Sequence, residues 1–381
     1  MKYAVALASS LGLLLSSICA AATSRPLMIV GAAVIHPDRP AETAVTQGET
    51  VFIVGSKIRY VGPAGKFKAP PNTRIIDASG KWVIPGLIDA HVHFAQSGNL
   101  YTRPDIADFN RWQPYAQEVK RNKARVPATF KVWLASGVTG VVDLGGPTWS
   151  FDVRSRARQT VAAPHVAVAG PMVSLIPRPQ LALDDPPMVY VTFAEEARQL
   201  VAHNLQHRPD YIKIMWVRLA GDDLQAQTEI ARAAAEAAHA AHVPVAVHAT
   251  DLDVAKAALT VGADYLVHSV DDKPVDDEFV ELLRKRQALY CPTLAVIPRL
   301  KSVLANSWIA TPEEARLADP EILRTMGDLN HIPPEYVPEI VKTFSQKHLA
   351  FEPPAVALEK PSPSVGGGNH GGHGHGRGRA G

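Results

Sequence analysis

Apolar and polar positions alternate along the chain in two different ways. Between residues 27 and 84, short apolar runs are separated by turns rich in Gly, Pro, Asp and Asn, and no helical period is present. From residue 85 onward, amphipathic stretches with a helical period alternate with short apolar runs that are typical of buried strands. The pattern therefore predicts a small β layer followed by a large α/β domain.

The second part of the chain is predicted to contain seven strands that are separated by helices. These strands are VIPGLIDAHVHF (Val83–Phe94), GVTGVVDLGG, PHVAVAGPMV, DYIKIMWV, VPVAVHAT, ADYLVHSV and ALYCPTLAV. Helices between successive strands favour a parallel sheet with helical crossovers. Seven or eight such units favour a (β/α)8 (TIM) barrel over a doubly wound sheet, whose Gly-rich first turn is not present in this sequence.

The first residues of the chain are typical of an export signal. A lysine at position 2 is followed by an apolar run through Leu15 and by small residues that include Ala20 and Ala22. The apolar run is short for a membrane span. We expect residues 1–22 to be a signal peptide, and the mature protein to be periplasmic or secreted and not attached to a membrane.

The sequence after the predicted signal peptide divides into three further segments. Residues 23–84 are the predicted β segment, residues 85–350 the predicted barrel, and residues 351–381 a Gly/His/Pro-rich tail that is predicted to be disordered. The formal net charge is only +2 and no basic run is interleaved with aromatic residues, so nucleic acid is not an expected partner. We expect a small-molecule substrate, and the sequence leaves a homo-oligomer open.

Five chemically reactive side chains stand at or near the ends of the predicted strands. His91 and His93 are two residues apart and therefore point to the same face of their strand. Lys213 lies in the fourth strand, His248 ends the fifth and His268 ends the sixth. In a barrel these positions converge at one mouth, which favours a metal site over four unrelated structural histidines.

Lys213 is the most unusual of the five. An ammonium group inside an apolar strand is costly to bury unless it is paired or loses its charge. Its neighbours Ile212 and Ile214 are expected to face the surrounding helices, so Lys213 is expected to face the barrel interior. Two interpretations stay open: a buried ion pair with a carboxylate, or a lysine carboxylated by CO2 that bridges two metal ions.

Several of these segments resemble the metal-dependent amidohydrolase superfamily, particularly its imidazolonepropionase-like and Xaa-Pro dipeptidase-like branch. The segments that carry the resemblance are PGLIDAHVHF, DYIKI, VPVAVHA, ADYLVHSVDD and YCPTL, within roughly residues 27 to 300. The resemblance implies that the early β layer is half of a sandwich that strands after the barrel normally complete.

The resemblance also implies a metal centre and a reaction. His91 and His93 would hold one metal ion, His248 and His268 a second, and carboxylated Lys213 would bridge them. A bridging hydroxide would attack a carbonyl and hydrolyse a C–N bond in a small amide, a cyclic amide or a dipeptide. Zinc is the expected metal for imidazole and carboxylate ligands, with manganese, cobalt and iron as alternatives.

One residue that the resemblance requires is not found. An aspartate at the end of the eighth strand should shuttle the proton, but Asp319 and Asp328 stand in a helical stretch (residues 302–347) and Glu359 in a Pro-rich one. We expect either a natural truncation or, preferably, a shifted reading frame near residues 345–360. The alternative function is a catalytically inactive metal-binding remnant. A mononuclear deaminase is a weaker third reading, because Lys213 argues against it.

Two residues after the fourth strand are candidates for binding substrate. Trp216 and Arg218 could shape a substrate pocket, with Arg218 meeting a carboxylate, although a surface arginine fits the pattern equally well. Arg178, in the proline-rich loop after the third strand, is a similar case. Cys291 is the single cysteine outside the predicted signal peptide, so no intrachain disulfide is expected, and it is interpreted as a small buried residue.

Overall fold

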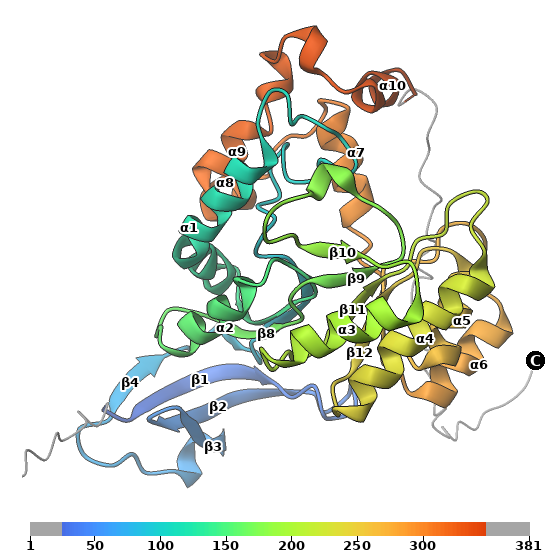
Figure 1. Cartoon of the computed structure of the whole chain (residues 1–381). Helices are drawn as coiled ribbons and strands as arrows, with labels where there is room; N and C mark the ends of the chain where they lie inside the picture. The colour runs from blue at the N-terminus through green and yellow to red at the C-terminus, as the bar shows by residue number, and fades with distance from the viewer. Residues whose placement is uncertain (1–24, 348–381) are drawn as a thin grey trace, which may run out of the picture. The chain divides into compact units, whose positions relative to one another are not determined.

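The computed structural model describes residues 25–347, which form two compact units (Figure 1). The first unit comprises residues 25–92, 130–142 and 153–167, and the second comprises residues 93–129, 143–152 and 168–347. The predicted signal peptide at residues 1–22 and the predicted tail at residues 351–381 lie outside the described residues.

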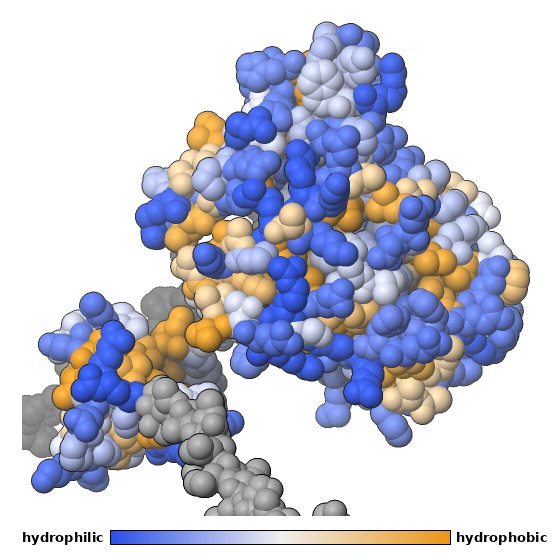
Figure 2. Space-filling view, turned by 60° about the vertical axis from the view of Figure 1, so that its left-hand side comes forward, coloured by the Kyte–Doolittle hydropathy of each residue, from blue (hydrophilic) through white to orange (hydrophobic). Residues whose placement is uncertain are grey.

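The first unit begins with the predicted β layer. Its strands are β1 (Leu27–Ile35), β2 (Val45–Val54), β3 (Lys57–Pro63), β4 (Arg74–Asp77) and β5 (Trp82–Val83). The order is β3-β2-β1-β4, with β5 paired to β1. A small core forms around Ala32, Val34 and Val51. Other apolar or aromatic side chains stay at the surface, among them Ile58 and Trp82. Figure 2 shows residues of high hydropathy in orange at the surface.

The first three strands of the α/β part form a separate sheet. They are β6 (Leu87–Val92), β7 (Val138–Asp143) and β8 (His165–Val168), in the order β6-β7-β8. The helices α1 (Tyr115–Ala135) and α2 (Ser150–Arg158) lie between them in the sequence. Gly86 permits close packing at the start of β6, because a Cβ atom at this position would lie 1.9 Å from the Thr139 hydroxyl oxygen.

The second unit contains a six-stranded sheet in which all neighbours are parallel. Its strands are β9 (Met172–Ser174), β10 (Met188–Tyr190), β11 (Ile212–Met215), β12 (Val245–His248), β13 (Tyr265–Val267) and β14 (Leu289–Cys291). The order is β10-β9-β11-β12-β13-β14. β11 to β14 are the predicted fourth to seventh strands, whereas β10 was not predicted. The α/β class and the parallel sheet are confirmed; closure into a barrel and the loss of an eighth strand stay predictions.

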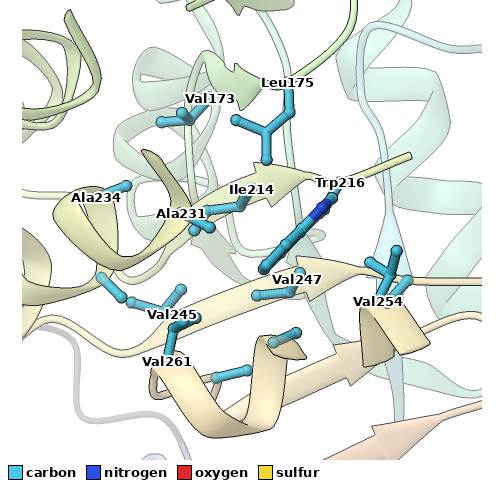
Figure 3. Close-up of a cluster of buried hydrophobic side chains, with 14 of the residues drawn as sticks. Val173, Leu175, Ile214, Trp216, Ala231, Ala234, Val245, Val247, Val254 and Val261 are labelled. Atoms are coloured by element: carbon cyan, nitrogen blue, oxygen red, sulfur yellow. The ribbon is translucent and has the colours of Figure 1, made fainter. Parts of the chain in front are cut away.

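Four helices cover this sheet on its outer side (Figure 1). They are α3 (Ala194–Leu205), α4 (Leu224–Ala240), α5 (Leu252–Val261) and α6 (Asp277–Arg286). Asp251 caps α5 by accepting hydrogen bonds from the N–H groups of Asp253 and Val254. The buried face of α4 consists largely of alanines, which let the helix approach the sheet closely. The resulting core, shown in Figure 3, includes Ile214 and Val247.

The last described part of the second unit is helical, as predicted. Its helices are α7 (Val296–Leu304), α8 (Pro312–Leu317), α9 (Pro320–Thr325) and α10 (Glu339–Lys347). Of these helices, α7 and α10 share an apolar cluster with the loop after β6, which contributes Tyr101 and Phe109. Across residues 25–347, none of the helices combines the length and the apolar character that a membrane crossing requires.

Candidate metal centre

Lys213 lies in the middle of β11 and is almost completely buried. Its side chain is 2% exposed, and its Nζ atom has no hydrogen-bond partner within the described part of the chain. Ile212 and Ile214 belong to the core beneath the helices, so Lys213 points to the opposite face of the sheet, as predicted. Burial lowers the pKa of Lys213 to about 7. Among residues 25–347 no carboxylate forms an ion pair with Lys213, so the described residues do not support the alternative of a buried ion pair.

His248 and His268 lie beside each other at the ends of two neighbouring strands. Their ring centroids are 4.5 Å apart, and the Nδ1 atom of His268 lies 2.8 Å from the Thr293 hydroxyl oxygen. Lys213 is paired with Ala246 in the β11–β12 ladder, so His248, two residues further on, shares the face of Lys213. Burial first, and then the neighbouring positive charges, lower the pKa of His248 and bring that of His268 to about 3.

His93 immediately follows β6 and is held in one orientation. Its Nδ1 atom lies 2.7 Å from the carbonyl oxygen of Gly145. A carbonyl can only accept, so Nδ1 carries the proton and Nε2 keeps its lone pair for a ligand. Burial is the main cause that lowers the pKa of His93 to about 4, and the charge of Lys213 contributes. His93 is therefore a neutral imidazole, the form that binds metals.

Asp143 is a buried carboxylate close to His93. Its side chain is fully buried, accepts hydrogen bonds from the backbone N–H groups of Phe94 and Gly145, and lies 3.9 Å from Nδ1 of His93. Burial raises the pKa of Asp143 to about 7. Asp143 was not among the predicted ligands at the strand ends, which are four histidines and one lysine. The end of the run GVTGVVD was the signal that could have found it.

His91 is the one predicted ligand that lies in the first unit. It is the second-last residue of β6, is half-buried, and its N–H group donates to Asp89 Oδ1 at 3.3 Å. Its predicted role rests on the sequence motif. Within residues 25–347, no three His, Cys, Asp or Glu side chains already form a group able to hold a metal ion. The charge of Lys213 nevertheless acts on His93, His248 and His268, so these four side chains lie within electrostatic reach of one another.

The two candidate substrate residues after β11 both have partners within the second unit. Trp216 is fully buried in the core of Figure 3, and its Nε1–H donates to Gln227 Oε1 at 3.0 Å. The prediction of a pocket residue is corrected here, because Trp216 has the same strand parity as Ile214 and therefore faces the helices. Arg218 forms ion pairs with Asp251 at 2.9 Å and Asp253 at 3.7 Å.

The backbone conformation of Gly145 positions the carbonyl group that orients His93. Its φ is +140°, and a Cβ atom there would lie 2.5 Å from Met172. We expect Gly145→Ala to cost about 1–3 kcal/mol of stability and to weaken the binding of a divalent metal ion about 10–100-fold by displacing the acceptor of His93. Thermal unfolding and competition with a chelator measure the two effects. Gly221→Ala, which also has a positive φ but open space around it, is the control; equal losses in both variants would contradict the argument.

Comparison with known proteins connects this geometry to one family. The model of the Amidohydrolase family matches residues 82–288. An adenine deaminase of Ruegeria sp. is 41% identical over 56 residues, 15% of this chain and 9% of that protein. An imidazolonepropionase of Pseudomonas syringae is 34% identical over 56 residues, 15% of this chain and 14% of that protein. The chain thus matches only a small part of the length of these curated relatives.

Solved structures share the fold over most of the chain. A prolidase complexed with N-methylphosphonate-L-proline has a TM-score of 0.58 at 24% identity, covering 84% of this chain and 73% of that one. A putative prolidase from Bifidobacterium longum has a TM-score of 0.55 at 23% identity, with coverages of 85% and 69%. The ochratoxinase of A. niger has a TM-score of 0.56 at 18% identity, with coverages of 85% and 72%. The predicted family resemblance is confirmed.

Proposed function

Because the chain belongs to the amidohydrolase family, we propose that it is a metal-dependent hydrolase that cleaves a C–N bond in a small amide, a cyclic amide or a dipeptide. The observation that carries this proposal is Lys213. Its buried amine has no hydrogen-bond partner among the described residues, and its charge acts on three imidazoles, which is a destabilising arrangement that a chemical role explains.

The residues of the second unit fit a divalent metal ion. His93, His248 and His268 are neutral and would supply nitrogen ligands, while His91 is assigned to the same role from its motif. Zinc suits such ligands. When bound, two such ions would polarise the substrate carbonyl and lower the pKa of water. The contribution of the chain is to hold the imidazoles in fixed orientations, as the Gly145 carbonyl does for His93.

Lys213 is proposed to act as a carboxylate. Its neutral amine would attack the carbon of CO2, so that an N–C bond forms while one C=O π bond opens and its electron pair moves to oxygen. One proton then leaves the nitrogen for the solvent, and the neutral amine becomes a carbamate anion. The two oxygens of the carbamate would then be available as ligands for the metal ions. This conversion gives the buried Nζ atom a bonding partner that the described residues do not provide.

A catalytically inactive metal-binding protein is the second candidate. Asp319 caps α9 and forms an ion pair with Arg125, and Asp328 accepts a hydrogen bond from the Tyr101 hydroxyl at 2.7 Å. Both carboxylates have structural partners, and within residues 25–347 no strand follows β14. This favours a chain that binds metal without a proton shuttle.

Metal analysis combined with an activity screen separates the two candidates. The purified full chain is loaded with zinc or manganese in the presence of bicarbonate, and its metal content and its hydrolysis of N-acyl amino acids, dipeptides and cyclic amides are measured. Bound metal with turnover supports the hydrolase, and bound metal without turnover supports the inactive candidate. A chain that binds no metal would contradict both.

A further inference from the structure

A cavity of about 400 Å³ lies in the part of the second unit that contains β9 and β10. Most of the side chains that line it are apolar, including Ile176, Pro179, Leu181 and Met188. Arg178 is the one charged residue among the described residues that line it. A ligand that fits this cavity therefore combines an apolar body with a negative charge.

Within residues 25–347, the charge on Arg178 is not neutralised by a partner of its own. The positive charge of Arg178 interacts electrostatically with the carboxylate of Asp105. However, both oxygens of Asp105 already accept hydrogen bonds from Arg103, at 2.9 and 2.8 Å. The Nε atom of Arg178 is buried and has no hydrogen-bond partner within the described residues. Two guanidinium groups thus share one carboxylate, and one positive charge remains to be balanced.

The cavity and the metal centre belong to the same end of the same sheet. Ser174, which lines the cavity, is paired with Met215 of β11, and Met215 is paired with His248 of β12. Two strand spacings amount to about 10 Å. That separation is on the scale of a dipeptide or an acylated amino acid.

We propose that Arg178 binds the carboxylate of the substrate, and that the proline-lined cavity holds the apolar side chain next to that carboxylate. This inference rests on the proposed function, because it places the scissile bond at the candidate metal centre. The substrate class is accordingly an amide or dipeptide whose released part is an apolar amino acid. Arginine suits this role because its guanidinium can donate two parallel hydrogen bonds to a carboxylate.

Calorimetric titration of the full chain tests the inference, with zinc and without it. The ligands are the N-acetyl derivatives of L-proline, L-leucine and L-phenylalanine, each compared with its uncharged amide. We expect at least one carboxylate to bind at least tenfold more tightly than its amide. Arg178→Met should remove this preference and Arg178→Lys should keep part of it. Arg198→Met, which changes an exposed arginine of α3, should leave it unchanged.

The outcomes separate the inference from the proposed function. A preference for carboxylates without hydrolysis would refute the hydrolase and leave the Arg178 site intact. Hydrolysis with equal affinity for carboxylates and amides would refute the Arg178 site alone. Failure of all three carboxylates to bind, or a preference that survives in a folded Arg178→Met variant, would also overturn it. Thermal unfolding establishes that each variant is folded.

Discussion

Replacing Lys213 with methionine is expected to abolish metal-dependent hydrolysis and, at the same time, to stabilise the metal-free protein. The variant cannot be carboxylated, so we expect the metal content to fall from about two ions per chain and kcat/KM to fall at least a thousandfold. Methionine has a similar length and no charge to bury. The pKa of Lys213 falls from 10.5 to about 7 on folding, which corresponds to roughly 3–5 kcal/mol of lost stability at neutral pH.

The same residue gives a pH dependence with a definite sign. Between pH 7 and pH 10.5, the unfolded state binds a proton at Lys213 that the folded state does not bind. The free energy of unfolding of the metal-free protein should therefore rise with pH across this window, by at most about 1.4 kcal/mol per unit. Denaturant titrations in CO2-free buffer measure the slope, which Lys213→Met should remove. Lys285→Met, at an exposed position of α6, should keep it. A flat profile for the unmodified chain would contradict the burial of an amine.

Replacing Trp216 with alanine is expected to cause the largest loss of stability of any change discussed. The side chain is fully buried among Ile214, Val247 and their neighbours, and its removal should cost about 3–5 kcal/mol. It also leaves Gln227 without its donor. Trp216→Phe keeps most of the packing and should cost about 1–2 kcal/mol. Urea denaturation measures both.

An exposed tryptophan is the control for this prediction. Trp82 is 60% exposed, and Trp82→Ala should change the free energy of unfolding by less than about 0.5 kcal/mol. If Trp216→Ala cost no more than Trp82→Ala and instead changed substrate affinity, the sequence-based assignment of Trp216 to a pocket would be restored.

The pattern of apolar and polar residues was sufficient to predict the strands and helices that alternate in the second unit. β11 to β14 and helices α3 to α6 follow from apolar runs and helical periods, and strand parity placed Lys213 opposite Ile214. Trp216 comes two residues after Ile214, so the same alternation of side chains would have predicted that Trp216 lies in the core. β10 was missed because it lies in a proline-rich loop, and α7 begins at Val296, earlier than predicted.

The features of the site that the sequence pattern did not predict depend on contacts between residues far apart in the sequence. The bond between His93 and the Gly145 carbonyl joins residues 52 positions apart, and nothing local to either residue indicates it. Arg103 and Asp105 are close in sequence and form an ion pair. Arg178, which a different loop contributes, also interacts with the Asp105 carboxylate, and this could not be predicted from the sequence. Sequence motifs therefore identified candidate ligands, whereas the structure was needed to show what orients them.

β14 has a consequence for handling the protein. It is the last strand of the six-stranded sheet, and within the described residues only β13 is paired with it. Leu289 on β14 is 61% exposed, and Leu294 just beyond it is 67% exposed. An apolar strand edge of this kind is a template for pairing with another chain. We therefore expect this edge to contribute to the colloidal behaviour of the protein, including its tendency to form aggregates as it is concentrated.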